Sequence, residues 1–237
     1  VSSNIIFEGN IVNDTDGGAA VQTYGDGTVI RNNRIRNGFI YVSKDPNNMN
    51  PIVNNVVISN NTVYGDRGIN LTAVVAANVT NNTINISGEY AIGVSAASAN
   101  NSIYNNRFNV SGNSWANVEA SRNASYWNTS LQSGTNIIGG SNLGGNYWAN
   151  GTGTGFSETC TDANGNGICD SNLTFDQNNT DYLPLAAVVQ CGNLNTASRT
   201  YALSQALTST GTCFTVAANS VTLDCNGYTV TYATSTN

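Results

Sequence analysis

Short apolar stretches recur along the first 110 residues, and each is broken by an asparagine or an Asn-Asn pair. The segments NIIFEGNIVND, GTVIRNNRIRNG, NVVISNNTVYG, NVTNNTINIS and NSIYNNRFNVSG carry alternating apolar positions on both sides of this break. The breaks fall at Asn10, Asn33, Asn61, Asn82 and Asn106, with spacings of 23, 28, 21 and 24 residues. Alternation over so few residues predicts short strands rather than helices.

A further strand is expected between successive breaks, in AAVQTYG, FIYVS, GINLTAV, YAIGVSA and WANVEAS. A repeat of 21–28 residues with several short strands is typical of a β-solenoid. Each coil then adds one strand to each of about three parallel sheets, and the coils lie ~4.8 Å apart.

The repeat also predicts which side chains stack from coil to coil. We expect an inward column formed by Ile5, Val29, Val57, Val79 and Ile103. The corner asparagines tolerate left-handed backbone, and their amides can hydrogen-bond along the stack. We therefore interpret them as structural ladders rather than as a ligand site.

The pattern fades after residue 130, and the change divides the chain into three expected segments. Residues 1–150 are expected to form coils that end in a Gly-rich turn, where Tyr147 and Trp148 cover the end of the core. Residues 151–187 are expected to be rich in loops. A new strand pattern occupies residues 188–237.

The composition restricts the partners and the compartment. Charged residues make up 9% of the chain, histidine is absent, and the net charge is −6 with a pI near 4.3. This balance argues against binding nucleic acid or anionic membranes, which need clustered Lys and Arg. The longest apolar run, YLPLAAVV, is far too short to span a bilayer. Five cysteines in so polar a chain favour an extracellular or cell-surface location.

The segment DANGNGICD carries the clearest chemical motif. Asp162, Asn164 and Asn166 occupy alternate positions, and Asp170 occupies the ninth. The pattern D-x-N-x-N-G-x-x-D corresponds to the first nine positions of an EF-hand-like loop, in which alternate side-chain oxygens converge on calcium. We therefore predict a structural calcium site; the alternative is a polar turn without a metal.

The rest of the predicted calcium shell is less complete. Ile168 would offer its backbone carbonyl from the seventh position. Leu173 occupies the place of the bidentate glutamate, so Asp176, Asp181 or water would have to complete the shell. Calcium would fix a loop that has little apolar burial of its own.

Cys160 and Cys169 flank this motif, and a disulfide between them would join the two ends of the calcium loop. Such a bond contributes roughly 2–3 kcal/mol by loop entropy. Zinc is not expected, because the chain has no histidine and these two cysteines are too far apart in sequence for a zinc knuckle.

Asn-X-Ser/Thr sequons are abundant and fit a glycosylated surface protein, although an Asn-rich chain produces many by chance. The candidate glycosylation sites are Asn13, Asn60, Asn70, Asn78, Asn81, Asn85, Asn100, Asn109, Asn123, Asn128, Asn150, Asn172 and Asn178.

Two segments carry a family resemblance. GGNYWANGTGTG, DANGNGICD and TDYLPL together resemble the closing segment of right-handed parallel β-helices of the CASH class, which comprises carbohydrate-binding proteins and sugar hydrolases and includes the periplasmic copper-processing β-helix family. CGNLNTASRTYALSQALTSTGTCFTVAANSVTLDCNGYTV resembles the opening segment of the same class. The resemblance covers nearly the whole chain and implies an all-β, right-handed parallel β-helix. It does not select a function.

In the opening segment, two of the three cysteines Cys191, Cys213 and Cys225 are expected to pair. Related opening segments lack either the first or the last of these cysteines, so Cys191–Cys213 and Cys213–Cys225 both remain open. The third thiol would be inert or would bond a neighbouring subunit.

The sequence offers little support for catalysis, and no catalytic residue is assigned. β-Helix lyases and glycosidases need clustered acids and bases, whereas the carboxylates of the coils are scattered: Glu8, Asp14, Asp16, Asp26, Asp45, Asp66, Glu89 and Glu119. One tyrosine per coil could form a face that stacks on sugars. These tyrosines are Tyr24, Tyr41, Tyr64, Tyr90 and Tyr104.

The order of the segments leads to the main functional hypothesis. Middle coils come first, a closing segment follows, and an opening segment comes last. We therefore expect copies of the chain to stack head-to-tail and form a filament or a tandem surface array, stabilised by calcium, disulfides and glycans. The alternatives are a carbohydrate-binding adhesin or surface-layer module, and a polysaccharide lyase or hydrolase.

Overall fold

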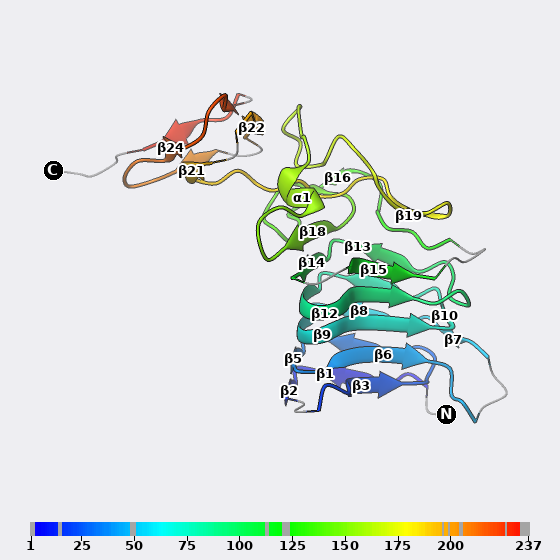
Figure 1. Ribbon diagram of the computed structural model, residues 1–237. Helices are drawn as coiled ribbons and strands as arrows, with labels where there is room; N and C mark the ends of the chain where they lie inside the picture. The colour runs from blue at the N-terminus through cyan, green and yellow to red at the C-terminus, as the bar shows by residue number, and fades with distance from the viewer. Residues whose placement is uncertain are drawn as a thin grey trace.

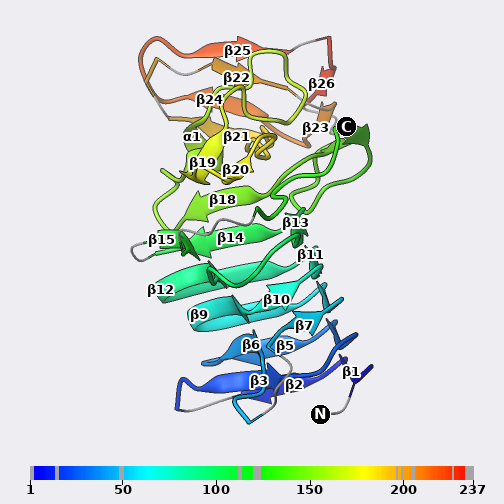
Figure 2. The ribbon, with the colours of Figure 1, turned by 90° about the vertical axis from the view of Figure 1, so that its right-hand side faces the viewer.

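The computed structural model describes residues 3–13, 16–47, 51–111, 114–119, 124–195, 197–198, 200–203, 206–225 and 227–232. Most of its strands pair in parallel and stack as successive coils along one axis (Figures 1 and 2). Within these ranges the one helix is α1 (Phe156–Thr159). None of the described helical structure is long and apolar enough to cross a membrane. The fold is a parallel β-helix, as predicted.

One sheet takes a single short strand from each of five coils. In order along the stack, its strands are β1 (Ile6–Glu8), β4 (Val29–Arg31), β8 (Val57–Ser59), β11 (Asn78–Thr80) and β13 (Ser102–Tyr104). Each pairs in register with the next, so one inward column contains Phe7, Ile30, Ile58, Val79 and Ile103. From Ile30 onward these side chains are fully buried.

The predicted inward column was therefore wrong in three of its five members. Ile5 is 42% exposed and lies just before β1. Val29 pairs in register with both Ile6 and Val57, so the two valines share the outward column of Ile6 and are half-buried. Each of these segments has two β-branched residues in succession, and a shift of one residue exchanges the two faces of a strand. Val79 and Ile103 are buried as predicted.

A larger sheet bends around the opposite side of the coils. Its strands are β2 (Ile11–Asn13), β3 (Ala19–Thr23), β5 (Arg34–Arg36), β6 (Phe39–Ser43), β9 (Thr62–Thr72), β12 (Thr83–Val94), β14 (Arg107–Val110), β15 (Ser114–Val118) and β18 (Tyr147–Asn150). In the first two coils the bend divides this side into two strands, β2 and β3, then β5 and β6. In the next two coils β9 and β12 each run through the bend as one long strand. A small pair, β7 (Val53–Asn54) and β10 (Val74–Val75), closes the third side.

The corner asparagines form the predicted ladder. Asn33 Nδ2 donates to Asn61 Oδ1 at 2.9 Å, and Asn61 Nδ2 donates to Asn82 Oδ1 at 3.0 Å. Asn82 continues the ladder to Asn106 at 2.9 Å, and Asn106 continues it to Asn146 at 2.9 Å. The backbone N–H of each asparagine donates to the same oxygen as its side chain. The ladder satisfies buried backbone groups at a corner where no strand can do so.

The Asn-Asn pairs have a simple conformational reason. The residue before each of the first five ladder asparagines has a positive φ of 54–70°, and these residues are Gly9, Asn32, Asn60, Asn81 and Asn105. Glycine and asparagine adopt this left-handed region most easily. The first residue of each pair therefore turns the chain, and the second enters the ladder.

Aromatic side chains close the upper end of the core. The Trp148 ring stacks on Phe108 with 4.7 Å between centroids, and Phe175 lies 5.2 Å from Trp148 and 4.6 Å from Trp127. Both tryptophans are fully buried, so the expectation for Trp148 is confirmed. Tyr147 faces the other way and packs in a separate cluster with Ile168 and Leu185.

Two antiparallel pairs belong to the same end of the stack: β16 (Gln132–Ser133) with β17 (Asn142–Leu143), and β19 (Leu173–Asp176), which carries Phe175, with β20 (Asn179–Asp181). Two further coils follow, and they lie at the end of the stack away from β1–β3 (Figures 1 and 2). The strands β21 (Gly192–Leu194), β22 (Thr200–Ala202) and β23 (Leu207–Thr208) pair in parallel with β24 (Phe214–Val216), β25 (Thr222–Asp224) and β26 (Val230–Thr231), respectively.

Candidate functional sites

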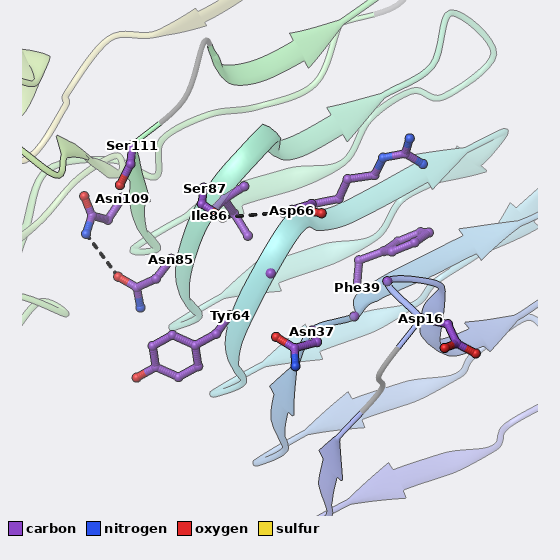
Figure 3. A pocket seen from close by; sticks show the side chains of 14 residues that line it. Asp16, Asn37, Phe39, Tyr64, Asp66, Asn85, Ile86, Ser87, Asn109 and Ser111 are labelled. Carbon is purple, nitrogen blue, oxygen red and sulfur yellow. Dashed lines mark hydrogen bonds between the residues drawn. The ribbon is translucent and has the colours of Figure 1, made fainter.

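A groove of about 640 Å³ runs along the bend of the large sheet (Figure 3). Asn109, Asn85 and Tyr64 line one side of it, and Phe39 and Asp16 line the other. The groove crosses successive coils, because Tyr64, Asn85 and Asn109 are register partners on β9, β12 and β14.

Two glycines, Gly38 and Gly65, line the groove where neighbouring coils come close together. A Cβ added to Gly65 would lie 3.0 Å from the carbonyl oxygen of Gly38 and 3.3 Å from its nitrogen. A side chain at Gly65 would therefore press against the backbone of the neighbouring coil.

The groove offers a mixture of aromatic, amide and charged groups. The Tyr64 ring is 39% exposed and lies 5.8 Å from the guanidinium carbon of Arg34. On the other wall, Arg67 covers the Phe39 ring at 5.6 Å and forms an ion pair with Glu89. An exposed ring held by a neighbouring cation presents its free edge and face to a ligand.

The amides of this groove are incompletely paired. Asn109 Nδ2 donates to Asn85 Oδ1 at 3.2 Å. Asn109 Oδ1 is shielded from solvent and has no partner within the described part of the chain. An unpaired acceptor costs stability unless a donor reaches it.

The tyrosines predicted to form one sugar-stacking face do not lie together. Tyr64 alone among them lines the groove. Tyr41 packs against Phe39 on β6 at 6.2 Å, and the Tyr90 hydroxyl accepts from Asn70 Nδ2 at 3.1 Å. Tyr104 lies on β13, in the other sheet. Tyr41 and Tyr90 both lie next to Asn70, which is the register partner of Tyr41, whereas Tyr64 and Tyr104 lie on other parts of the coils.

The predicted calcium loop forms a compact turn. Asp162 accepts from the backbone N–H groups of Asn166 at 3.1 Å and Gly167 at 2.8 Å. Asn164 Oδ1 accepts from Asn166 N at 3.0 Å, and Asn166 Oδ1 accepts from Ile168 N at 2.9 Å. Burial raises the pKa of the Asp162 carboxyl. These hydrogen bonds are those of a polar turn, and calcium binding by the loop stays a prediction.

The acids proposed to complete this loop are used elsewhere. Asp176 ends β19, and both its oxygens accept from Asn179 Nδ2 at 3.0 Å. Asp181, on β20, is fully buried and accepts from the Trp148 ring N–H. Among the described residues, no three His, Cys, Asp or Glu side chains group as a metal site. Asp170 Oδ2 accepts from Ala163 N at 3.0 Å, within the loop itself.

Asp181 is a fully buried ionisable group with a strongly raised pKa. Its Oδ2 accepts from Asn146 N at 2.8 Å and from Trp148 Nε1 at 2.9 Å, and its Oδ1 accepts from Leu183 N at 3.2 Å. Burial raises its pKa to about 7, against the opposing effect of these donors. The sequence suggested no role for this aspartate other than completing the calcium shell.

The disulfide expectations are resolved. Cys160 pairs with Cys169, as predicted from their positions around the loop. Cys191 pairs with Cys213 across the two last coils, which decides between the two alternatives. Cys225 is a free, exposed thiol.

The sequons divide by their place in the fold. Asn60, Asn81 and Asn100 are exposed, left-handed residues, and each precedes a buried asparagine. The turn itself therefore explains these Asn-Asn-Ser/Thr sequences. Asn13, Asn78 and Asn172 are also exposed, whereas six sites are partly buried: Asn70, Asn85, Asn109, Asn128, Asn150 and Asn178. Asn123 lies outside the described residues, and glycosylation stays a prediction.

Residues 1–153 match the family described as periplasmic copper-binding protein (NosD). The chain belongs to the NosD family. A periplasmic family agrees with the location outside the cytoplasm that the cysteines predicted. Curated proteins and solved structures gave no significant match.

The description of the NosD family names copper, and the side chains of this chain can be compared with the ligands that copper prefers. Copper prefers imidazole, thiolate and thioether ligands. The chain has no histidine and one methionine, Met49, which lies outside the described residues. Four of its five cysteines form disulfides. The residues present do not fit a copper site.

Sequence reasoning missed the groove and the burial of Asp181. The groove needs glycines and side chains from several coils, which no single motif displays. Asp181 is 35 residues from its ladder partner Asn146. An isolated acid in the apolar context of TDYLPL was the one available signal.

Proposed function

We propose that the chain is a structural module of a periplasmic or cell-surface β-helix assembly, in which copies stack head-to-tail. The main support is the open face of the last described coil. There, Phe214, Leu223, Val230 and Tyr232 line an apolar hollow of about 570 Å³. In the described part of the chain, β24 pairs with β21 alone, so its other edge is free for a further strand.

The first coil offers a complementary face. β1 and β2 each pair on one side within the described residues. Phe7 and Val12 point into the core but remain half-buried at this end. The strands β24–β26 pair only with the preceding coil among the described residues, so their free edge faces the direction in which a next coil would follow. The strands β1–β3, within the described ranges, pair only with the following coil, so their free edge faces the opposite direction. Stacking by translation would therefore continue both the parallel pairing and the apolar core, and would give an open-ended array.

Blocking each face separately tests this assembly. Val12→Glu blocks the backward face, and Phe214→Glu blocks the forward face. We expect each variant alone to stay monomeric in sedimentation and electron microscopy, whereas a mixture forms one-to-one dimers through the intact pair of faces. Tyr182→Glu, at a 60% exposed position outside both faces, should assemble like the unmodified chain. An unmodified chain that stays monomeric at high concentration would rule out the proposal.

Carbohydrate binding is the second candidate, and the groove beside Tyr64 supports it. Exposed aromatic rings next to amides and hydroxyls suit the apolar faces and hydroxyl groups of sugars. Titration with neutral oligosaccharides of increasing length tests this role. Tyr64→Ala should weaken binding while Tyr182→Ala should not. Equal affinity of both variants would remove the groove from consideration.

Calcium binding by residues 162–170 remains part of the proposal. Its support is the convergence of Asp162, Asn164 and Asn166 on one turn and the disulfide that joins the ends of that turn. Such a site would be structural, since it holds a loop at the surface. We propose no role for Asp176 in it, because Asn179 occupies both its oxygens.

A further inference from the structure

The ligand chemistry of residues 1–153 disagrees with the metal in the NosD description. We infer that the coils of this chain keep the NosD fold without a copper site. The matched segment contains no histidine and no cysteine, and Met49 is its one soft donor. Copper sites in proteins use several such donors. Carboxylates would have to supply the remaining ligands.

Arginines neutralise two of these carboxylates. Glu8 Oε2 accepts from Arg31 at 2.8 Å, and this bond lowers the pKa of Glu8. Glu89 pairs with Arg67, which in turn covers the Phe39 ring. A cation that approached either acid would compete with a guanidinium already in place.

Turns use other carboxylates of the segment. Asp26 Oδ1 accepts from the backbone N–H of Asn54 at 2.7 Å, and Glu119 Oε2 accepts from that of Ala96 at 3.1 Å. Both bonds join one coil to the next. These acids lie in separate turns, and the described residues contain no cluster of three acidic, His or Cys side chains. The carboxylates therefore act as structural acceptors rather than as one ligand set.

The spacing of the coils would allow side chains on neighbouring strands to share a metal ion. The types of residue in the coils, rather than the backbone, therefore determine whether copper binds. Thr62 and Thr83 are register partners on β9 and β12, and both are partly exposed. Neighbouring coils lie ~4.8 Å apart, so two imidazoles placed there would reach one ion. The variant with Thr62→His and Thr83→His therefore provides a positive control on the same fold.

The test measures copper retention directly. The chain carrying Cys225→Ser, which removes the exposed free thiol, is loaded in parallel with Cu(II) sulfate and with Cu(I) under argon, then desalted. Copper content is read by atomic absorption, and bound Cu(II) by electron paramagnetic resonance. We expect no stoichiometric copper and no shift in melting temperature. The same chain with the two histidines should retain copper and show a nitrogen-coordinated signal.

The opposite result is equally clear. Stoichiometric copper on the Cys225→Ser chain would overturn the inference, and its loss on adding Met49→Leu or Glu8→Gln would locate the site in the coils. Copper that the unmodified chain retains but Cys225→Ser loses belongs to the thiol, outside residues 1–153, and leaves the inference standing. Circular dichroism of each variant confirms that the coils are intact.

Discussion

The backbone N–H of Asn146 donates to Asp181 Oδ2 at 2.8 Å, and the Asn146 side-chain amide donates to the same oxygen at 3.4 Å. Every ladder amide below it donates in the same direction, from Asn10 through Asn106. A further asparagine in place of Asp181 would bring donors of its own, which need acceptors. A carboxyl group has no N–H donors, and Asp181 Oδ2 accepts from both nitrogens of Asn146, so Asp181 ends the ladder.

This end point predicts a pH dependence of stability. Burial raises the pKa of Asp181 from 3.8 to about 7 in the folded chain. Between these values the folded chain holds a proton that the unfolded chain releases, so the free energy of unfolding should fall as pH rises from about 4 to about 7. The slope from this group is at most about 1.4 kcal/mol per pH unit. Urea midpoints at several pH values within this window measure it.

Asp181→Asn is the control for this dependence. Residue 181 cannot ionise in this variant. The urea midpoint of the variant should therefore vary less between pH 4 and pH 7 than that of the unmodified chain. Exposed carboxylates are unchanged in it and give the background slope. An identical pH profile in both proteins would show that Asp181 does not control this window.

The ladder itself should be a main source of stability. Asn82 accepts from both nitrogens of Asn61 and donates to Ile58 O at 2.8 Å and to Asn106 Oδ1 at 2.9 Å. Asn82→Ala leaves several buried groups without partners, each worth about 1–3 kcal/mol. We expect a loss of roughly 3 kcal/mol or more in urea unfolding.

Asn81→Gly provides the matched control for this variant. Asn81 is the exposed neighbour with φ of 58°, a conformation that glycine adopts without strain. The change removes one side-chain hydrogen bond, which Asn105 Nδ2 donates to Asn81 Oδ1, and should cost about 1 kcal/mol, well below the loss for Asn82→Ala. Similar losses for the two variants would mean that the turn, rather than the ladder, determines stability.

Local chemistry explains which features the sequence predicted. An Asn-Asn pair combines a left-handed turn with a buried amide. Each corner could therefore be predicted from its own short segment of sequence. The inward face was harder, because Val29-Ile30 and Val57-Ile58 present two apolar residues in succession. Packing against the neighbouring coil determines that the second residue of each pair faces the core. The sequence of the segment alone does not indicate which of the two residues is buried.

The cysteines show what coil spacing adds to such a prediction. Cys191 and Cys213 are 22 residues apart, close to the length of one coil, and therefore lie in one column of adjacent coils. Cys225 follows Cys213 by about half a coil and is exposed. The repeat length could have selected the correct pair. The groove, in contrast, depends on how five coils bend together, which the sequence pattern does not report.

Chelation should reveal whether residues 162–170 bind calcium. A ligand present at 100 times its dissociation constant stabilises the folded state by about 2.7 kcal/mol. We expect excess chelator to lower the melting temperature by several degrees, since about 1 kcal/mol corresponds to roughly 2–4 °C at this chain length. Asp162→Asn should melt at the lower temperature with or without chelator.

Asp45→Asn is the matched control, because Asp45, like Asp162, accepts a backbone N–H in a turn, from Asn47 at 2.9 Å, and lies outside the loop. It should keep the full response to chelator. If the unmodified chain melts at the same temperature with and without chelator, residues 162–170 form a metal-free turn.

The disulfide between Cys191 and Cys213 should stabilise the two last coils specifically. Their cluster of buried residues contains only Leu203, Leu207 and Cys213, far fewer than the main core. Closing a loop of this size contributes about 3 kcal/mol. Replacing both cysteines by serine should therefore increase amide hydrogen exchange in residues 192–231 while exchange in residues 57–110 stays slow. Cys225→Ser removes an exposed thiol without a disulfide and should change neither region. Faster exchange throughout the chain in the double variant would instead mean that the last coils and the main solenoid unfold as one unit.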